Sequence, residues 1–308
     1  MDQILKDDIR FINKFLYSIQ KHRIGLGNWI DAKKRAGIEP SKRVTALFDD
    51  ITEQEKSAKR IAREVVSMTA IWDEFFENVN GIGECYATTL LAEIGEISRF
   101  KTPSALWAYF GQTAQYVLAD CSKGHKIMMS SDKHKTCPIF ANQEDEPCGG
   151  DITITDRVQG VPKRKKGYHY LFNSTGKTLC WKIAGNLIKQ GDDYYKNIYH
   201  TAKKYYSNKA EADGLIIVPA EQLKSVSAKD KVKYISLGHI DNRAKRKMVK
   251  TFLVHLWEAW REVEGLDTRP PYVIEKLGHQ GYIKWAEVKE LLREGRRKIK
   301  EASEEEEA

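Results

Sequence analysis

Asn80-Gly81-Ile82-Gly83-Glu84 opens a stretch whose apolar residues, up to Leu91, recur at helical spacing. Glycine at both turn positions permits positive φ and leaves no Cβ in the way, so backbone N–H groups and a helix N-terminus can approach a phosphate closely. We interpret the pattern as a helix-hairpin-helix that holds a nucleic-acid backbone without sequence preference through Gly81, Ile82 and Gly83. The alternative is a turn that merely joins two helices of a bundle.

Upstream of this turn, residues 41–79 carry apolar side chains in steps of three and four, as in the a and d positions of a heptad repeat. The pattern predicts a coiled-coil-like helical segment, either an intramolecular packing stripe or an interface between two copies of the chain. Still earlier, the spacing from Ile4 to Ile19 predicts an amphipathic helix. We expect the glycines at positions 25 and 27 to end it.

Downstream, two short helices are expected to end at Gly95 and Gly111. Thr102 before Pro103 places a capping hydroxyl and a first-turn proline together. The pairing of these short helices around a glycine turn strengthens the nucleic-acid interpretation.

Residues 112–160 change character, with few periodic apolar positions and three of the five cysteines. Thiolates and imidazoles at this density suit tetrahedral zinc, which would stabilise a loop too polar to have its own core. We expect structural zinc on three cysteines and one of two histidines, rather than free thiols in an irregular loop. The candidate ligands are Cys121, His125, His134, Cys137 and Cys148.

Residues 159–189 contain seven Lys or Arg residues and no acid, with aromatic residues between the charges. Such a run is often only a solvated face, but here it is also a reasonable platform for phosphates and bases. A further basic cluster opens a helix near residue 243, whose apolar positions and His255 we expect in the core. The candidate nucleic-acid-binding cations are Lys163, Arg164, Lys165, Lys166, Lys177, Lys182, Arg243 and Arg246.

The whole chain has 308 residues and a formal net charge of +8, which favours a polyanionic partner. Its odd number of cysteines argues against a disulfide framework. Neither a signal peptide nor a transmembrane run is visible, so we expect a cytoplasmic protein without membrane contact. Residues 304–307 are all glutamate and are expected to be disordered.

The expected fold is mainly α, a long coiled-coil-like helix followed by a helix-hairpin-helix domain with a small zinc-ribbon-like insertion. The expected segments are an N-terminal helix and loop (1–40), the coiled-coil-like segment (41–79), the helix-hairpin-helix (80–111), the Cys/His-rich insertion (112–160), a basic helical part (161–300) and an acidic tail (301–308).

Residues 81–100, followed by Ser104-Ala105-Leu106-Trp107-Ala108-Tyr109-Phe110-Gly111, resemble the C-terminal domain of the 110/116/902 group of insertion-sequence transposases. In that group the domain follows a coiled-coil helix. Here the matching stretch likewise follows the heptad pattern of residues 41–79. Lys163-Arg164-Lys165-Lys166-Gly167 and the segment 177–184 resemble what comes next, and residues 243–272 are similar to the tails of archaeal relatives. The resemblance covers roughly half of the chain and implies DNA binding in recombination.

The chain departs from this group in two places. Full-length members begin with a ribonuclease-H-like domain, whereas residues 1–78 have a helical pattern without carboxylate-bearing strands. The group's domain also resembles serine recombinases in using a serine nucleophile in a Ser-Gly step, which here corresponds to Gln159-Gly160. Glutamine cannot form the covalent intermediate of a serine hydroxyl. Ser174 and Ser122 lie nearby, but each is better explained as a cap or turn residue.

Three hypotheses follow. The first is a transposase-related DNA-binding protein without the group's catalytic centres, acting as an accessory or domesticated factor. The second is an active minimal transposase in which Ser174 or a partner supplies the chemistry, and Mg²⁺ is expected only in this case. The third is a structural scaffold with an incidental basic face. DNA is the expected partner, structured RNA the alternative, and a second copy of the chain is expected on the coiled-coil-like segment.

Overall fold

The computed structural model describes residues 1–113, 115–130, 132, 134–140, 146–160, 166–227, 229–275 and 281–307. Helices dominate it, as expected from the sequence. The elements in chain order are α1 (Gln3–Arg35), α2 (Lys42–Ser67), α3 (Ala70–Glu74), η1 (Phe76–Asn78), α4 (Glu84–Ile94), η2 (Ile97–Arg99), α5 (Pro103–Tyr109), β1 (Gln115–Cys121), β2 (Lys126–Met129), β3 (Ile152–Gln159), β4 (Tyr168–Tyr170), α6 (Ser174–Gln190), α7 (Asp193–Ala212), β5 (Ile216–Val218), α8 (Gln222–Ser225), η3 (Asp230–Lys233), β6 (Tyr234–Ser236), α9 (Leu237–Val263), α10 (Tyr272–Glu275) and α11 (Trp285–Glu307).

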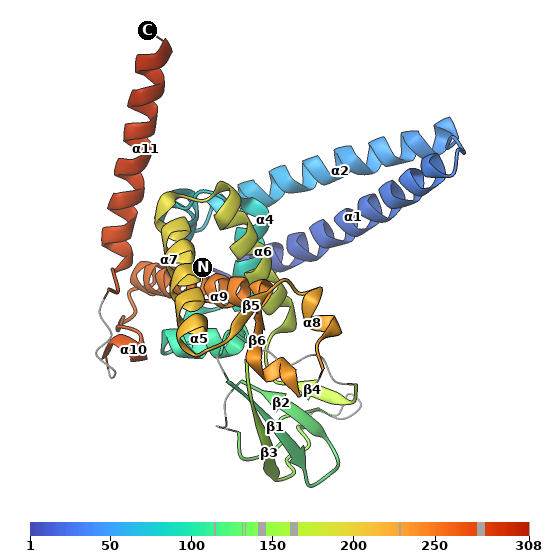
Figure 1. Cartoon of the computed structure of the whole chain (residues 1–308). Coiled ribbons are helices and arrows are strands. Elements are labelled where there is room, and N and C mark those ends of the chain that lie inside the picture. Colours follow the sequence, from blue (N-terminus) through green and yellow to red (C-terminus); the bar gives the residue numbers. More distant parts are fainter. Residues whose placement is uncertain are drawn as a thin grey trace.

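Helices α1 and α2 form a hairpin that projects from the helical body (Figure 1). Leu16 and Ile19 of α1 pack against Ala58 and Ala62 of α2 in a small core of their own. Within this core Glu55 is 3% exposed, and its carboxylate pairs with Lys59 at 2.7 Å and with Arg23. The small alanines let the two helices approach closely, so the hairpin is a stiff arm.

The expected break at positions 25 and 27 is wrong, because α1 continues through both glycines to Arg35. Glycine in a helix interior costs only about 1 kcal/mol relative to alanine, which packing against α2 can offset. A Cβ at Gly27 would lie 3.2 Å from the ring of Phe48, so this glycine lets α2 approach. Ile30, one turn later, is buried.

The heptad pattern of residues 41–79 belongs to more than one helix, since α2 ends at Ser67 and the chain turns into α3 and η1. The buried face of α2 consists of Glu55, Ala58, Ala62 and Val66, of which only Val66 reaches the main core. By contrast, Leu47, Ile61 and Met68 are 51%, 40% and 73% exposed. The part of the pattern beyond Met68 reflects burial of α3 and η1 in the main core.

Helix α9 is the centre of the main core, with Trp257 and Trp260 almost fully buried. The Trp257 indole donates a hydrogen bond to the Phe100 carbonyl at 2.7 Å, which fastens η2 to α9. His255, expected in the core, is fully buried, with its Nδ1 2.9 Å from the Tyr195 hydroxyl and its Nε2 3.1 Å from the Ile283 carbonyl oxygen. Burial lowers its pKa to about 4, so it is a neutral packing residue.

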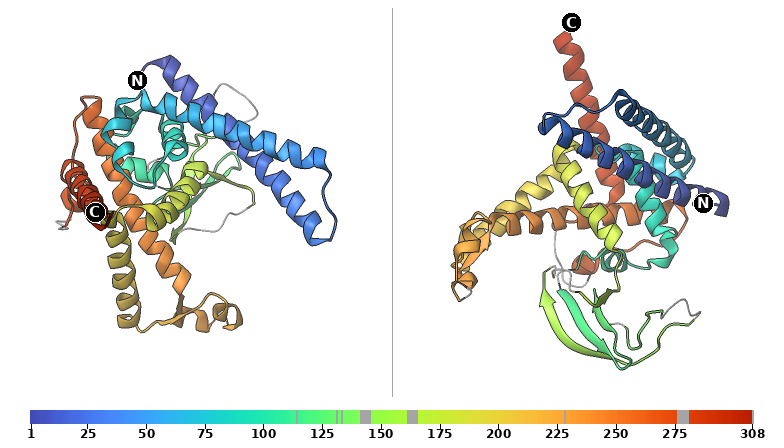
Figure 2. Two further views of the ribbon diagram at one scale, coloured as in Figure 1. Left: turned by 90° about the horizontal axis from the view of Figure 1, so that it is seen from above. Right: turned by 90° about the vertical axis from the view of Figure 1, so that its right-hand side faces the viewer.

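The sequence pattern missed the sheet, which the structure places in and beside the expected insertion. Its strand order is β3-β1-β2-β4, with β1 antiparallel to β2 and β3, and β2 parallel to β4. It lies below the helical body in Figure 1 and again in the right-hand view of Figure 2. Strand β1 is buried on both faces from Tyr116 to Ala119 and therefore lacks the alternation typical of a surface strand.

Two features of the C-terminal part were not expected. Residues 214–236 contain α8, η3 and two short strands, and β5 pairs in parallel with β6. The acidic end, expected to be disordered, continues α11 to Glu307. Glutamate is a good helix former, and extending an existing helix avoids the cost of nucleating one.

Candidate metal centre and cationic cavity

The Cys/His cluster is built by the β1–β2 hairpin and the segment that leads into β3. Cys121 ends β1, and His125 precedes β2 after a tight turn in which Gly124 has a φ of +90°. The other two residues of the cluster, Cys137 and Cys148, face each other across paired backbone, in which Cys148 N–H donates to the Ile139 carbonyl at 2.7 Å. Bridges between Thr136 and Asp151 and between Phe140 and Pro147 hold this segment together.

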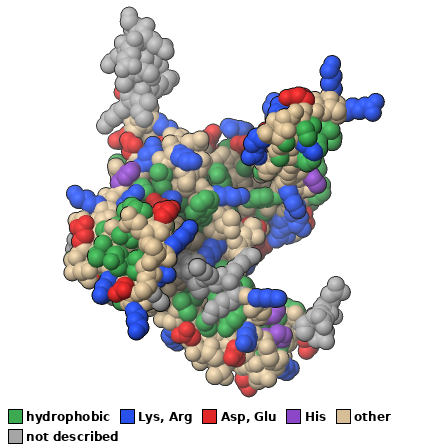
Figure 3. All heavy atoms as spheres, turned by 45° about the vertical axis from the view of Figure 1, so that its right-hand side comes forward, with side chains coloured by type: hydrophobic (Ala, Val, Ile, Leu, Met, Phe, Trp, Pro, Cys, Tyr) green, Lys and Arg blue, Asp and Glu red, His purple; other side chains and the backbone are tan. Residues whose placement is uncertain are grey.

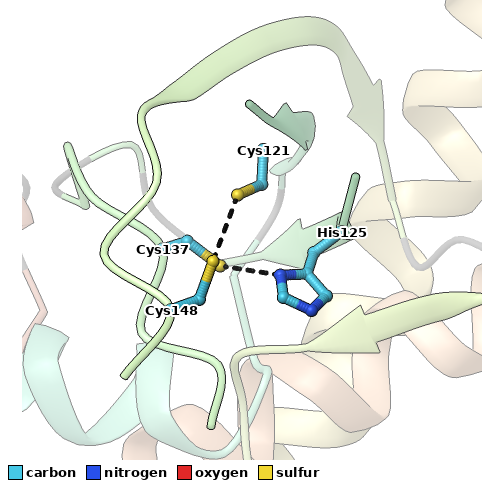
Figure 4. Close-up of side chains that lie close together, drawn as sticks. All are labelled: Cys121, His125, Cys137 and Cys148. Carbon is cyan, nitrogen blue, oxygen red and sulfur yellow. Dashed lines mark hydrogen bonds between the residues drawn. The ribbon is translucent and has the colours of Figure 1, made fainter. Parts of the chain in front are cut away.

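The four side chains converge on one point (Figure 4), and their ligand atoms all lie within 4.8 Å of one another. Cys121 Sγ lies 3.6 Å from Cys148 Sγ, and Cys137 Sγ lies 3.5 Å from His125 Nδ1. Four ligands around zinc, at about 2.3 Å for sulfur and about 2.0 Å for nitrogen, would stand roughly 3.8 Å (sulfur to sulfur) and roughly 3.5 Å (sulfur to nitrogen) apart. The cluster therefore has dimensions that fit a metal ion such as zinc.

The thiols of the cluster differ in how readily they ionise. Burial opposes ionisation of Cys121, but the Lys123 amide, which donates to Cys121 Sγ at 3.3 Å, and contacts to His125 lower the Cys121 pKa to about 7. Burial raises the pKa of the Cys137 thiol to about 11. All five cysteines are free of disulfides. A metal ion would replace these thiol contacts with thiolate ligation.

The sequence left open which histidine completes the cluster, and the geometry selects His125. His134 is exposed and lies outside the group. Gly150 is essential to the packing of the cluster, because a Cβ there would lie 2.7 Å from Cys121 Sγ and 2.9 Å from Ser122 Oγ. Ser122 is a turn residue, as expected, since its hydroxyl accepts a hydrogen bond from the Asp151 amide.

The glycine turn after η1 is tied to the body. Gly81 has a φ of +85°, and its carbonyl accepts a hydrogen bond from Asn186. The backbone and side chain of Asn80 both donate to the Asp192 carboxylate, at 3.0 and 2.6 Å. Ile82 is only 3% exposed, so it packs in the core and has no surface for a ligand. Gly83, the cap of α4, faces open space.

The expected nucleic-acid-binding cations do not form one continuous surface. Lys163, Arg164 and Lys165 lie outside the described residues, and Lys166 is exposed beside β4. Lys177 Nζ lies 4.8 Å from the centroid of the Tyr116 ring, while Lys182 Nζ lies 5.3 Å from that of Tyr17 on α1. On the face drawn in Figure 3, Lys and Arg side chains are spread over the arm and the body, with Asp and Glu among them.

Arg243 and Arg246, by contrast, meet in a cavity of about 810 Å³ between α5, α7, α9 and the segment around α10. Gln159 and Gly160, the step that corresponds to the serine position of the resembled group, also line this cavity. Of the described residues that line it, none is acidic and none is a serine or cysteine. Asp241 of α9 does not line it and is bonded to Tyr199 and Lys245.

The cavity also contains residues that the sequence patterns did not single out. Lys247 and Lys250 of α9 add two further cations. Lys250 Nζ lies 3.9 Å from the centroid of the Trp107 ring, and burial, together with Arg246, lowers the Lys250 pKa to about 8. Their spacing along α9, at positions 243, 246, 247 and 250, is the i, i+3, i+4, i+7 pattern of one helix face. This spacing of charges could have been recognised in the sequence as one charged helix face. Only the fold shows that this face lines a cavity.

Comparison with protein families gives a match in the middle of the chain: the model described as Transposase IS116/IS110/IS902 family matches residues 73–115. Over these residues the chain is similar to that transposase family. The match covers α4, η2 and α5, together with the glycine turn, and confirms the resemblance inferred from the sequence. The match supports a transposase of this group. No curated protein and no solved structure matches the chain.

Among the described residues, no helix is both long and apolar enough to cross a membrane.

Proposed function

We propose that this chain is a transposition-related DNA-binding protein that holds the nucleic-acid backbone in its cationic cavity. The observation that carries the proposal is the cavity itself, in which Arg243, Arg246, Lys247 and Lys250 face a space lined by no described acid. Phosphate contacts from such residues supply sequence-independent affinity and position a protein on DNA. The family match at residues 73–115 supplies the transposition context.

We further propose that the chain alone does not cut or join DNA and acts as an accessory or domesticated factor. The serine position of the resembled group corresponds to Gln159, which lies in the cavity wall. Ser174 is the first residue of α6, after the Asn173 cap, and does not line the cavity. A covalent serine mechanism therefore has no described nucleophile at the cavity.

A cleavage assay tests this part of the proposal. Supercoiled and branched DNA is incubated with the protein, with and without Mg²⁺ and Mn²⁺, and the products are examined for nicks and for covalent protein–DNA adducts. We expect salt-sensitive complexes and no cleavage products. A metal-dependent nuclease would instead release free ends, and a serine nucleophile would leave a covalent adduct. Nicks or adducts that vanish in Ser174→Ala would establish the active-transposase alternative.

We propose zinc as the metal of the Cys121, His125, Cys137 and Cys148 cluster. Three sulfurs and one imidazole nitrogen are the ligand set typical of closed structural zinc sites. The cluster holds together the β1–β2 hairpin and the start of β3, so its expected role is to stabilise the sheet. Gln159 ends β3, and the sheet thus also shapes one wall of the cavity.

The glycine turn remains a second proposed backbone contact, now restricted to the Gly83 end. Supporting it is the open space at Gly83, the cap of α4, because the first N–H groups of a helix have no partner within that helix. Asp192, bonded to Asn80, places a negative charge at the other end of the turn. We therefore expect the cavity to contribute more to affinity than the turn.

A further inference from the structure

The two least exposed cations of the cavity, Arg246 and Lys250, have no acidic partner. In the part of the chain that the structure describes, neither forms an ion pair. Both side chains are half-buried, and this burial lowers the pKa of each. A buried, unpaired charge is costly, so an anion between these two side chains would supply the missing partner.

Aromatic rings stand beside these cations. The Arg243 guanidinium lies over the Tyr206 ring, with Cζ 4.9 Å from the ring centroid. A guanidinium stacked on one aromatic ring leaves its outer face free to stack on a base. Tyr194 and Tyr282 add two more rings to the walls of the cavity. The cavity thus combines cations for a phosphate with flat surfaces for a base, as single-strand-binding sites do.

The size of the cavity distinguishes an unpaired strand from a duplex. A volume of about 810 Å³ is that of a site for a small ligand, whereas the major groove of a duplex alone is about 12 Å wide and the whole duplex is wider still. Both strands of a duplex therefore cannot enter together. One nucleotide fits a cavity of this size, within the range of about 300–1,000 Å³ that holds small ligands.

We propose that the cavity takes an unpaired nucleotide of a nucleic-acid strand, with its phosphate between Arg246 and Lys250 and its base on the Arg243–Tyr206 stack. This inference rests on the proposed function, because it names what the same cavity recognises. In a transposition-related complex, such nucleotides occur where the duplex is opened or ends. The site would then retain an unpaired strand, while other cations contact the neighbouring duplex.

The test measures affinity of the full chain by fluorescence anisotropy for four probes: a short oligothymidine, an oligouridine, an abasic strand of equal length and a blunt duplex. We expect oligothymidine to bind about tenfold more tightly than the abasic strand, since stacking of a base contributes that much. A preference between oligothymidine and oligouridine identifies DNA or RNA as the source of the nucleotide, and either ranking agrees with the proposal.

Variants assign the effect to the cavity. Arg246→Gln and Lys250→Gln should each weaken oligothymidine binding about tenfold, and Tyr206→Leu should weaken it by a similar factor without affecting the abasic strand. The matched control is Lys204→Gln, at an exposed residue of α7 that lies outside the cavity. Circular dichroism and thermal melting confirm that each variant is folded.

The outcomes separate the inference from the function on which it rests. If the abasic strand binds as tightly as oligothymidine, or if Tyr206→Leu has no effect, the base is not recognised and the inference is overturned, while cation-dependent duplex binding still supports the proposed function. If Arg246→Gln and Lys250→Gln bind every probe as the unchanged protein does, both the inference and the cavity function are overturned.

Discussion

At position 150 only glycine fits, because its backbone passes directly against Cys121 Sγ and Ser122 Oγ. We expect Gly150→Ala to lower zinc affinity at least tenfold, since the added methyl group would push the Cys121 ligand out of the tetrahedron. Zinc release measured with a chromogenic chelator checks this. Gly185→Ala is the control, as its Cβ would meet nothing within 4 Å in α6, and it should keep its zinc. Equal zinc affinity of Gly150→Ala and the unchanged protein would contradict the proposed ligand geometry.

Lys250 should make nucleic-acid binding depend on pH. Burial and Arg246 lower its pKa to about 8, so the side chain is a cation below that pH and becomes neutral above it. Burial lowers the pKa of His239 and raises those of Tyr194 and Tyr282, so these three cavity groups stay neutral at roughly pH 7 to 9. We expect affinity to fall several-fold as pH rises from about 7 to about 9.

The comparison for this pH profile is Lys250→Gln, which removes the titrating group and keeps a polar side chain. Its affinity should be lower than that of the unchanged protein at about pH 7 and nearly constant up to about pH 9. Bound phosphate raises the pKa of a neighbouring ammonium group, so affinity should begin to fall near the pKa of Lys250 in the free protein, about 8, and should level off only above its pKa in the complex. A profile of the unchanged protein that is flat, or the same slope in Lys250→Gln, would remove Lys250 from the binding site.

At the scale of elements, we expect the proposed zinc ion to stabilise the four-stranded sheet. Protein purified without added metal should contain about one zinc per chain by elemental analysis. Cys148→Ser should lose it and melt at a lower temperature, because the segment before β3 has little apolar core beyond Ile127 and Ile139. Cys85→Ser, a half-buried cysteine on α4 outside the cluster, should retain the zinc. A folded Cys148→Ser protein with unchanged stability and zinc content would refute the metal site.

Helix α2 carries the proposed contact between two copies of the chain. Leu47, Ile61 and Met68 are all exposed and are spaced by multiples of seven residues, as in one position of a heptad repeat. We expect Leu47→Glu combined with Ile61→Glu to shift a dimer to a monomer in light scattering, because charges would replace apolar contacts. A single monomeric mass for the unchanged protein would show that this face is only solvent-exposed.

At the glycine turn, Gly83 is better suited to substitution than Gly81. Gly81 has positive φ and lies against α6, so a side chain there would strain the fold itself. Gly83 has ordinary φ and open space around it, so Gly83→Val should leave stability nearly unchanged and still block a close phosphate. Duplex affinity should fall by about twofold to fivefold. Unchanged affinity would make the turn a purely structural joint.

Elements differ in how far the sequence predicts them. The Thr102 cap and Pro103 at the start of α5, the apolar face of α9 and the three cysteine ligands follow from local patterns, and the structure contains all of them. Strand β1 could not be recognised, because it is buried on both faces and has no alternation. The prediction that Gly25 and Gly27 end the first helix was wrong, because packing of α1 against α2 outweighs the low helix propensity of glycine.

At the scale of the molecule, the cavity could not be predicted from the sequence. Its walls come from residues as far apart as Trp107, Gln159, Lys250 and Tyr282, which meet only through tertiary packing. Trp107 illustrates this, because its indole donates a hydrogen bond to the carbonyl of Lys250 at 3.0 Å and so joins α5 to α9. The basic run at residues 159–189 was visible in the sequence, whereas the cations that face the cavity lie on α9.

The whole chain should bind DNA mainly through displaced counterions, so the salt dependence of binding is the most direct measure of the cavity's role. The logarithm of the association constant for a duplex with an unpaired end is plotted against the logarithm of salt concentration, for the unchanged protein and for Arg243→Gln/Arg246→Gln/Lys250→Gln. We expect affinity to fall with salt, and the slope of the triple variant to be smaller by about two to three units, because each cation that no longer neutralises a phosphate reduces the slope by about one. Parallel lines for the two proteins would contradict the account, because the cavity cations would then bind no phosphate.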